Sequence, residues 1–517
     1  MTAGAFAERS SGVLLHLTSL PGPYGAGDLG PAAHRFAEFL AAAGQRFWQM
    51  LPVVPPGGGD SPYDSPSAFA GSPWLVSLEF LARDGWLQAS DLTAPSRLAL
   101  AERTRYRATK RFRGPRLRKA FENFRARPGA QHELSAFADT NRDWLPDYAL
   151  FRALQRAHRG APWTSWSREL VRRETPALDR ARSELAGEVE FELFVQREFS
   201  RQWAHLRGRS AELGVRLLGD VPMFVAHDAA DVWQHQRFFQ LDEHGHRRVV
   251  AGVPPDYFSA DGQLWGNPIY DWSALRESHY SWWIARLRRT LERFDAVRLD
   301  HFIGFHRYWQ VPAGASSARG GTFVEAPGYD FFERLRAELG HLPFVAEDLG
   351  ALTDEVVRLR DHFGLPGMRV LGFAFAGDWR EYQPHRFPRR TVAYTGTHDN
   401  DTLMGWLTSH QREKDVQRAR ALAKERERAL LYAGSDGREP HWDLIRTLVA
   451  SVADTTIFPI QDLLGQGTDA RMNVPGTPAG NWTYRVAAKD LTPHLAERLY
   501  ELCDRYERVP PSTRRPA

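Results

Sequence analysis

The sequence contains almost no cysteine and no long apolar run, and each absence excludes a class of protein. Cys503 is the single cysteine among 517 residues, so the chain cannot build a disulfide framework or a cysteine-ligated zinc site. No run reaches the roughly 20 apolar residues that a membrane span requires, and the first residues show no basic stretch followed by an apolar one. We therefore expect a cytoplasmic protein that does not bind membranes.

A strong excess of charge of one sign is also missing. The chain has 67 Lys and Arg against 63 Asp and Glu, which gives a formal net charge of +4. Proteins dedicated to nucleic acid usually concentrate positive charge, so we expect no nucleic-acid partner. Basic residues are dense between 103 and 127, where they favour a solvated helix face over a site for an acidic partner. No feature assigns an oligomeric state.

The signals for a metal or a cofactor are absent or incomplete. None of the 19 histidines forms an HExxH pair, so a zinc site has little support from the sequence. Residues 25–30 formally match a dinucleotide fingerprint, but the strand that should follow, 47–53, carries no carboxylate for the ribose. We interpret 25–30 as a loop that lines a site or supports the fold, and we expect no cofactor and no metal.

Short apolar segments alternate with helical patterns along the chain, which favours a parallel α/β barrel. Pro31 predicts the first position of a helix that runs to about residue 43. The chain is long for one barrel, so we expect a single domain, 1–517, with insertions at about 57–210, largely helical, and about 223–290, where 252–267 is rich in turn residues. Strands are predicted at 12–17, 47–53, 215–222, 294–301, 343–348, 367–372, 391–396 and 455–462.

Three of these strands lead into acids, Asp300, Glu347 and Asp399, at the barrel end where chemistry takes place. Retaining glycosidic cleavage uses a nucleophilic carboxylate and a protonated carboxyl about 5 to 5.5 Å apart, and Asp300 and Glu347 are the candidates. Arg298 shares a strand face with Asp300 and can hold it ionised. His398 and Asp399 suit recognition of sugar hydroxyls. Acids at strand ends also fit a magnesium enzyme, so the acids alone leave that alternative open.

Several motifs together resemble the 4-α-glucanotransferases (amylomaltases or disproportionating enzymes) of glycoside hydrolase family 77, in the α-amylase clan. They include Arg298-Leu299-Asp300-His301, Thr397-His398-Asp399-Asn400 and Asn473-Val474-Pro475-Gly476-Thr477. The resemblance implies a (β/α)8 TIM barrel with large insertions after strands 2 and 3 and no separate C-terminal β-sandwich. The matching segments follow the family's order over nearly the whole chain: 16–30, 61–71, 219–225, 252–267, 298–301, 346–350, 397–400 and 473–477.

The resemblance also implies roles for individual residues. It gives Asp300 as nucleophile, Glu347 as general acid/base and Asp399 as the acid that stabilises the transition state, with Arg298 and His398 assisting. Tyr63 would stack on a donor-site sugar, although its loop alone allows a merely packed tyrosine. Segment 252–267 matches a loop that would cover the cleft. The remaining residues expected to line the glucan cleft are Asp220, Asp256, Gln263, Trp265 and Asn473.

The expected activity is transfer of a segment of an α-1,4-glucan to the 4-hydroxyl of another glucan or of glucose, through a covalent glycosyl-enzyme and without a cofactor. The expected partners are α-1,4-glucans and maltooligosaccharides. An α-amylase-type hydrolase and a non-catalytic glucan-binding protein are the alternatives. Asp64 and Ser72 stand where the family usually has glutamine and asparagine, which makes the preferred glucan length less secure than the chemistry.

Overall fold

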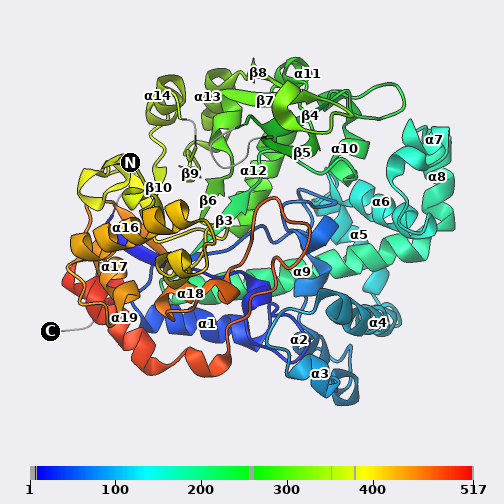
Figure 1. Ribbon diagram of the computed structural model, residues 1–517. Coiled ribbons are helices and arrows are strands. Elements are labelled where there is room, and N and C mark those ends of the chain that lie inside the picture. Colours follow the sequence, from blue (N-terminus) through cyan, green and yellow to red (C-terminus); the bar gives the residue numbers. More distant parts are fainter. Residues whose placement is uncertain (1–5, 7, 256–260, 351, 378–379, 515–517) are drawn as a thin grey trace.

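Eight parallel strands close into a barrel in the computed structural model, which describes residues 6, 8–255, 261–350, 352–377 and 380–514 (Figure 1). Going round the barrel, the strand order is β1-β12-β11-β10-β9-β6-β3-β2. All eight predicted strands are confirmed, and together they make the predicted (β/α)8 fold. The strands are β1 Ser10–Leu14, β2 Phe47–Gln49, β3 Arg216–Val221, β6 Ala296–Leu299, β9 Phe344–Ala346, β10 Gly367–Val370, β11 Thr391–Tyr394 and β12 Thr455–Pro459.

Helices surround the barrel because each carries one apolar stripe. In α1 the residues Ala33, Phe36, Ala37 and Leu40 recur at helical spacing and are fully buried, and Pro31 occupies the predicted first turn. α1 packs against α9 and α19. The helices outside the two insertions are α1 Pro31–Ala42, α13 Gly328–Leu339, α14 Asp354–His362, α15 Leu403–Leu407, α16 Val416–Ala433, α17 Pro440–Val449, α18 Ile460–Leu463 and α19 Pro493–Arg505.

The stretch between β2 and β3 is helical and lies to one side of the barrel, on the right in Figure 1. Its last helix, α9, leads back into β3. A shorter set of helices lies between β3 and β6. The first group is α2 Leu78–Arg83, α3 Ser96–Ala99, α4 Tyr106–Arg125, α5 Ala130–Thr140, α6 Leu145–Ala157, α7 Arg168–Val171, α8 Thr175–Glu184 and α9 Ala186–Glu212, and the second is α10 Ala230–Gln234, α11 Trp272–Glu277 and α12 Ser281–Arg293.

The expectation that the basic stretch 103–127 forms a solvated face is wrong for one arginine. Arg113 on α4 is fully buried and forms a 2.7 Å ion pair with Asp28. Its guanidinium also donates to the carbonyl oxygens of Ala26 and Val76. The position of Arg113 in α4 gave no sign of this burial, because its partners precede Arg113 in the chain by 37 residues or more.

A second, antiparallel sheet lies beside the barrel mouth, in the order β5-β4-β7-β8. Its strands are β4 Val249–Val253, β5 Gln263–Pro268, β7 Arg307–Pro312 and β8 Thr322–Glu325. The interpretation of 252–267 as a loop throughout is therefore wrong, because both ends of the segment pair as strands; residues 256–260 lie outside the described residues. β7 and β8 follow β6, in a stretch for which the sequence predicted no insertion.

No helix in the described ranges is long and apolar enough to cross a membrane.

Candidate active site

Asp300 and Glu347 follow two neighbouring strands, β6 and β9, at the same end of the barrel. β6 pairs with β9 so that Leu299 lies opposite Ala346, and the next residue of each strand is the acid. Adjacent strands are about 4.8 Å apart, so this register brings the two acids within one inter-strand spacing. The Glu347 carboxylate accepts a hydrogen bond from the backbone N–H of His301 at 2.8 Å, which ties it to the residue that follows Asp300.

Arg298 connects Asp300 to a second buried carboxylate. Its guanidinium contacts Asp300 at 2.7 Å and donates to both oxygens of Asp220, at 2.9 and 2.8 Å. Asp220 lies on β3, directly opposite Arg298 in the ladder with β6. The side chains of Arg298 and Asp220 are 5% and 0% exposed, so their contacts are shielded from water. Asp300 remains 28% exposed and reaches the mouth.

The Glu347 carboxyl is set up to carry a proton. Burial raises its pKa to about 8, and the charges of Asp300 and Asp348 act in the same direction, whereas Arg298 and the His301 N–H oppose them. A carboxyl with this pKa is largely protonated at neutral pH. The structure therefore places a carboxyl that can act as a proton donor directly after β9.

His398 and Asp399 lie on the connection from β11 to α15, and the chain that follows α18 holds them. Asn473 donates from its side-chain amide to Asp399 Oδ1 at 2.6 Å and from its backbone to the His398 carbonyl at 3.0 Å. Arg471 donates to the Asp399 carbonyl at 2.5 Å. The Asp399 side chain remains 42% exposed, which leaves its other oxygen accessible beside His398 at 3.4 Å.

Tyr63 is part of the same constellation and does more than pack against its own loop. Its hydroxyl donates to Asp220 at 2.7 Å, and burial raises its pKa well above the usual value, which keeps the hydroxyl protonated. Its ring stacks on His398 with centroids 5.2 Å apart and lies 5.7 Å from the ring of Trp482. Tyr63 therefore couples the Asp220–Arg298 pair to His398.

β5 brings Trp265 to the side of the mouth where Asp300 lies. The indole meets the His301 ring edge-to-face at 4.9 Å and donates to the Gln263 side chain at 3.1 Å. Trp265 is 38% exposed, which is high for a tryptophan. Asp256, another expected cleft residue, lies outside the described residues.

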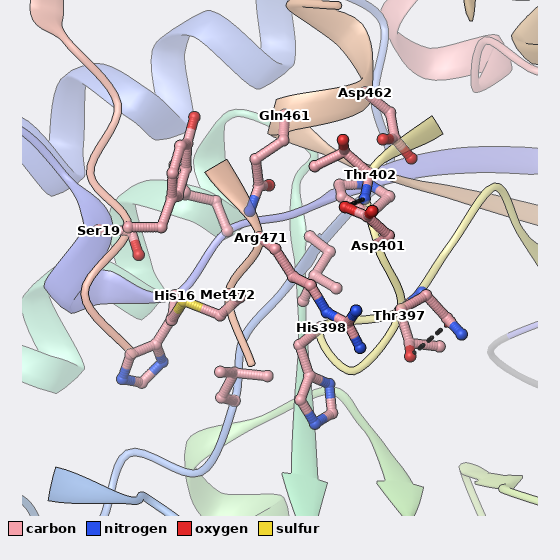
Figure 2. A pocket seen from close by; sticks show the side chains of 16 residues that line it. His16, Ser19, Thr397, His398, Asp401, Thr402, Gln461, Asp462, Arg471 and Met472 are labelled. Atoms are coloured by element: carbon pink, nitrogen blue, oxygen red, sulfur yellow. Dashed lines mark hydrogen bonds between the residues drawn. The ribbon is translucent and has the colours of Figure 1, made fainter. Parts of the chain in front are cut away.

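A cavity opens beside His398, between the ends of β1, β11 and β12 (Figure 2). His16, two residues beyond the end of β1, borders the cavity. Burial lowers the pKa of this imidazole to about 3, so it is neutral, and its Nδ1 has no hydrogen-bond partner among the described residues. Sequence reasoning singled out neither His16 nor Arg471 nor Trp482. The rule that selected the three acids, a polar residue at a strand end, would have found His16.

Among the described residues, no cluster of three or more histidine, cysteine or acidic side chains could hold a metal ion. Two acids at the ends of paired strands, one of them carrying a proton at neutral pH, match instead what acid-assisted displacement at a glycosidic carbon requires. Together with Arg298 and the accessible Asp399 on the loop after β11, these acids give the barrel a site typical of enzymes that act on glycosidic bonds.

Comparisons with known proteins narrow this class to one family. The profile of glycoside hydrolase family 77, described as 4-alpha-glucanotransferase, matches residues 15–491. The 4-alpha-glucanotransferase of Thermus thermophilus is 46% identical over 97% of this chain and 99% of its own length. That of Synechocystis is 44% identical over 97% and 98%. The solved structure of amylomaltase from Streptococcus agalactiae in complex with acarbose has a TM-score of 0.92 at 36% identity, covering 97% of this chain and all of that one. The chain belongs to the 4-alpha-glucanotransferase family.

Proposed function

We propose that this protein transfers segments of α-1,4-glucans to the 4-hydroxyl of an acceptor glucan or glucose by a retaining double displacement. The observation that carries the proposal is the β6–β9 register, which sets Asp300 against a Glu347 whose pKa is raised to about 8. Asp300 attacks the anomeric carbon while Glu347 protonates the leaving oxygen. Glu347 then removes the proton from the incoming 4-hydroxyl, which displaces Asp300.

The other residues bind and orient the sugar in this proposal. Arg298 pairs with Asp300 and orients it. Asp399 with His398 binds the hydroxyls of the distorted ring, an interaction that strengthens in the transition state. The remaining cleft residues are Tyr63, Asp220, Asp256, Gln263, Trp265 and Asn473. The mechanism requires no cofactor. We also propose that barrel and insertions act as one catalytic domain, located in the cytoplasm, as the single cysteine suggests.

Incubation with pure maltotriose tests this function. Transfer produces a ladder of longer maltooligosaccharides together with glucose, because each glycosyl-enzyme is captured by another sugar. Small sugars alone would establish the alternative of an α-amylase-type hydrolase. An unchanged substrate that nevertheless binds would leave only a glucan-binding protein.

The pH dependence of transfer should have a basic limb near pH 8. Glu347 must be protonated to assist the leaving oxygen, and the protonated fraction falls as pH rises through the pKa of about 8. We therefore expect kcat/KM to fall about tenfold per pH unit well above that value. Initial rates with maltotriose from pH 5 to 10 measure this. Undiminished kcat/KM at pH 9.5 would contradict the assignment of Glu347 as proton donor.

Trp265→Ala should lower transfer more than hydrolysis. Both outcomes start from one glycosyl-enzyme, and the partition depends on whether sugar or water reaches it first. Trp265 offers a half-exposed aromatic face beside His301, suited to an acceptor glucose. Such stacking is worth about 0.5 to 1.5 kcal/mol, so the ratio of hydrolysis to transfer should rise a few-fold up to about tenfold.

The measurement is glucose liberated by water against ladder products from maltotriose. Phe323→Ala is the matched control, since Phe323 is an exposed aromatic on β8, at the far edge of the same sheet, and its loss should leave the ratio unchanged. An unchanged ratio at reduced overall rate in Trp265→Ala would mean that Trp265 serves donor binding or folding instead.

A further inference from the structure

One buried carboxylate closes the connection that carries His398 and Asp399. Asp462, on α18 beyond β12, accepts a hydrogen bond from the Thr395 hydroxyl at 2.6 Å through Oδ2 and from the Leu403 backbone N–H at 2.7 Å through Oδ1. Thr395 follows β11 directly and Leu403 is the first residue of α15. The two donors therefore mark the two ends of the segment, and one carboxylate ties them together.

The carboxylate is placed for this task and for no direct contact with a sugar. Asp462 is 1% exposed, and Figure 2 shows it beside Asp401 and Thr402, on the opposite side of the cavity from His16. Burial raises its pKa to about 6, with the charge of Asp401 acting in the same direction and the Thr395 and Leu403 bonds opposing. It is therefore ionised at neutral pH, and both of its bonds are of the strong, charge-assisted kind.

The middle of the segment has a separate set of contacts. Asn473 and Arg471 bind Asp399, but both are themselves loop residues beyond α18. The Asp399 side chain is 42% exposed, so packing alone does not hold it in place. A segment whose ends can move apart shifts the carboxylate at its centre, and a displacement of about 1 Å at a reacting centre can reduce a rate about 10²-fold.

We propose that Asp462 is a positioning residue for Asp399 and His398: by fixing both ends of the 395–403 segment it holds the transition-state acid at the distance the sugar ring requires. This inference rests on the proposed function, in which Asp399 binds the distorted sugar. Asp462 itself touches no substrate. Its removal should therefore act through Asp399, lowering kcat with little change in KM, because the interaction it supports is made mainly in the transition state.

Asp462→Ala removes both ties and should lower kcat about 10²-fold. Asp462→Asn is the conservative variant: its amide oxygen can accept from Leu403, and its amide nitrogen can donate to the Thr395 hydroxyl oxygen. The kcat of Asp462→Asn should remain within about tenfold of the wild-type value, because neutral hydrogen bonds replace charge-assisted ones. The matched control is Asp454→Ala. Asp454 precedes the same strand, β12, at the opposite end of the barrel, where it pairs with Arg389; its loss should lower the melting temperature and leave kcat nearly unchanged.

A double-mutant cycle with Asp399→Asn separates positioning from general destabilisation, with glucosyl fluoride as donor at high enzyme concentration. If Asp462 acts through Asp399, Asp462→Ala should reduce kcat only a few-fold further once Asp399→Asn is present. Asp454→Ala should have the same small effect on kcat in the Asp399→Asn background as it has in the wild-type protein. A full 10²-fold further loss from Asp462→Ala, or a rise in KM alone, would overturn the proposal.

Two further results keep the test decisive. If Asp462→Ala shows no cooperative thermal unfolding, Thr395→Val takes its place, because it removes one donor and nearly preserves shape, with Thr395→Ser as the variant that retains the hydroxyl. The cycle is then run with Thr395→Val. Full additivity of Thr395→Val with Asp399→Asn would likewise overturn the proposal. A wild-type protein that yields no ladder from maltotriose, or an Asp399→Asn variant as active as wild type, would instead refute the proposed function.

Discussion

Replacing Asp300 with asparagine should abolish transfer while leaving the protein folded. The change is nearly isosteric, but it removes the carboxylate that would form the bond to the anomeric carbon. Loss of a nucleophile ordinarily costs several orders of magnitude, so kcat should fall by at least about 10³-fold. Arg298 keeps both of its bonds to Asp220 in the variant, so its buried charge is not left unpaired.

Asp295→Asn is the matched control, because it makes the same substitution at the other end of the same strand. The Asp295 carboxylate accepts from the Leu217 N–H at 2.8 Å, just before β6 begins, at the barrel end that serves stability. The kcat of Asp295→Asn should stay close to the wild-type value. Both variants are compared by rate on maltotriose and by melting temperature. An Asp300→Asn protein that retains more than about a tenth of the wild-type rate would be incompatible with a covalent role.

The parts of the site that strands carry were predictable from the sequence. In a parallel barrel all strands point their C-terminal ends to one rim, so an acid directly after an apolar run is placed once the strand is recognised. This reasoning led to Asp300 and Glu347, and to Arg298 two residues before Asp300. The β3–β6 and β6–β9 registers then bring these side chains together. Alternation alone predicted that Arg298 and Asp300 share a strand face, as their 2.7 Å contact requires.

The contacts that fix the loops were not predictable, because they join residues far apart in the chain. Asp399 lies five residues beyond β11, and its position depends on Asn473, 74 residues later. The hydroxyl of Tyr63 donates a hydrogen bond to Asp220, which lies 157 residues later in the chain. Trp265 was expected on a loop because glycines and prolines surround it, yet β4 provides a partner strand, and tertiary pairing overrides the local turn signal. Local sequence carries none of this information.

Glu347→Gln should stop transfer from glucans but be relieved by a donor that needs no proton. Glutamine cannot protonate the leaving oxygen, so the first displacement becomes slow with maltotriose. Fluoride departs from a glucosyl fluoride without protonation, so the glycosyl-enzyme should still form on Asp300. We expect the rate on maltotriose to fall about 10²- to 10⁴-fold, the usual contribution of general acid catalysis, and much of that loss to disappear for the first step with the fluoride.

Asp399→Asn is the comparison that makes this result specific. Asp399 is proposed to bind the distorted sugar ring, which both donors contain. The activated donor should therefore not relieve the loss of rate in Asp399→Asn. The release of fluoride in the first turnover measures the step directly, before removal of the acceptor proton becomes limiting. If Glu347→Gln and Asp399→Asn respond alike to the fluoride, the assignment of Glu347 as proton donor and Asp399 as the acid that binds the distorted ring is wrong. The raised pKa of Glu347 would then reflect its burial beside Asp300 and not a role as proton donor.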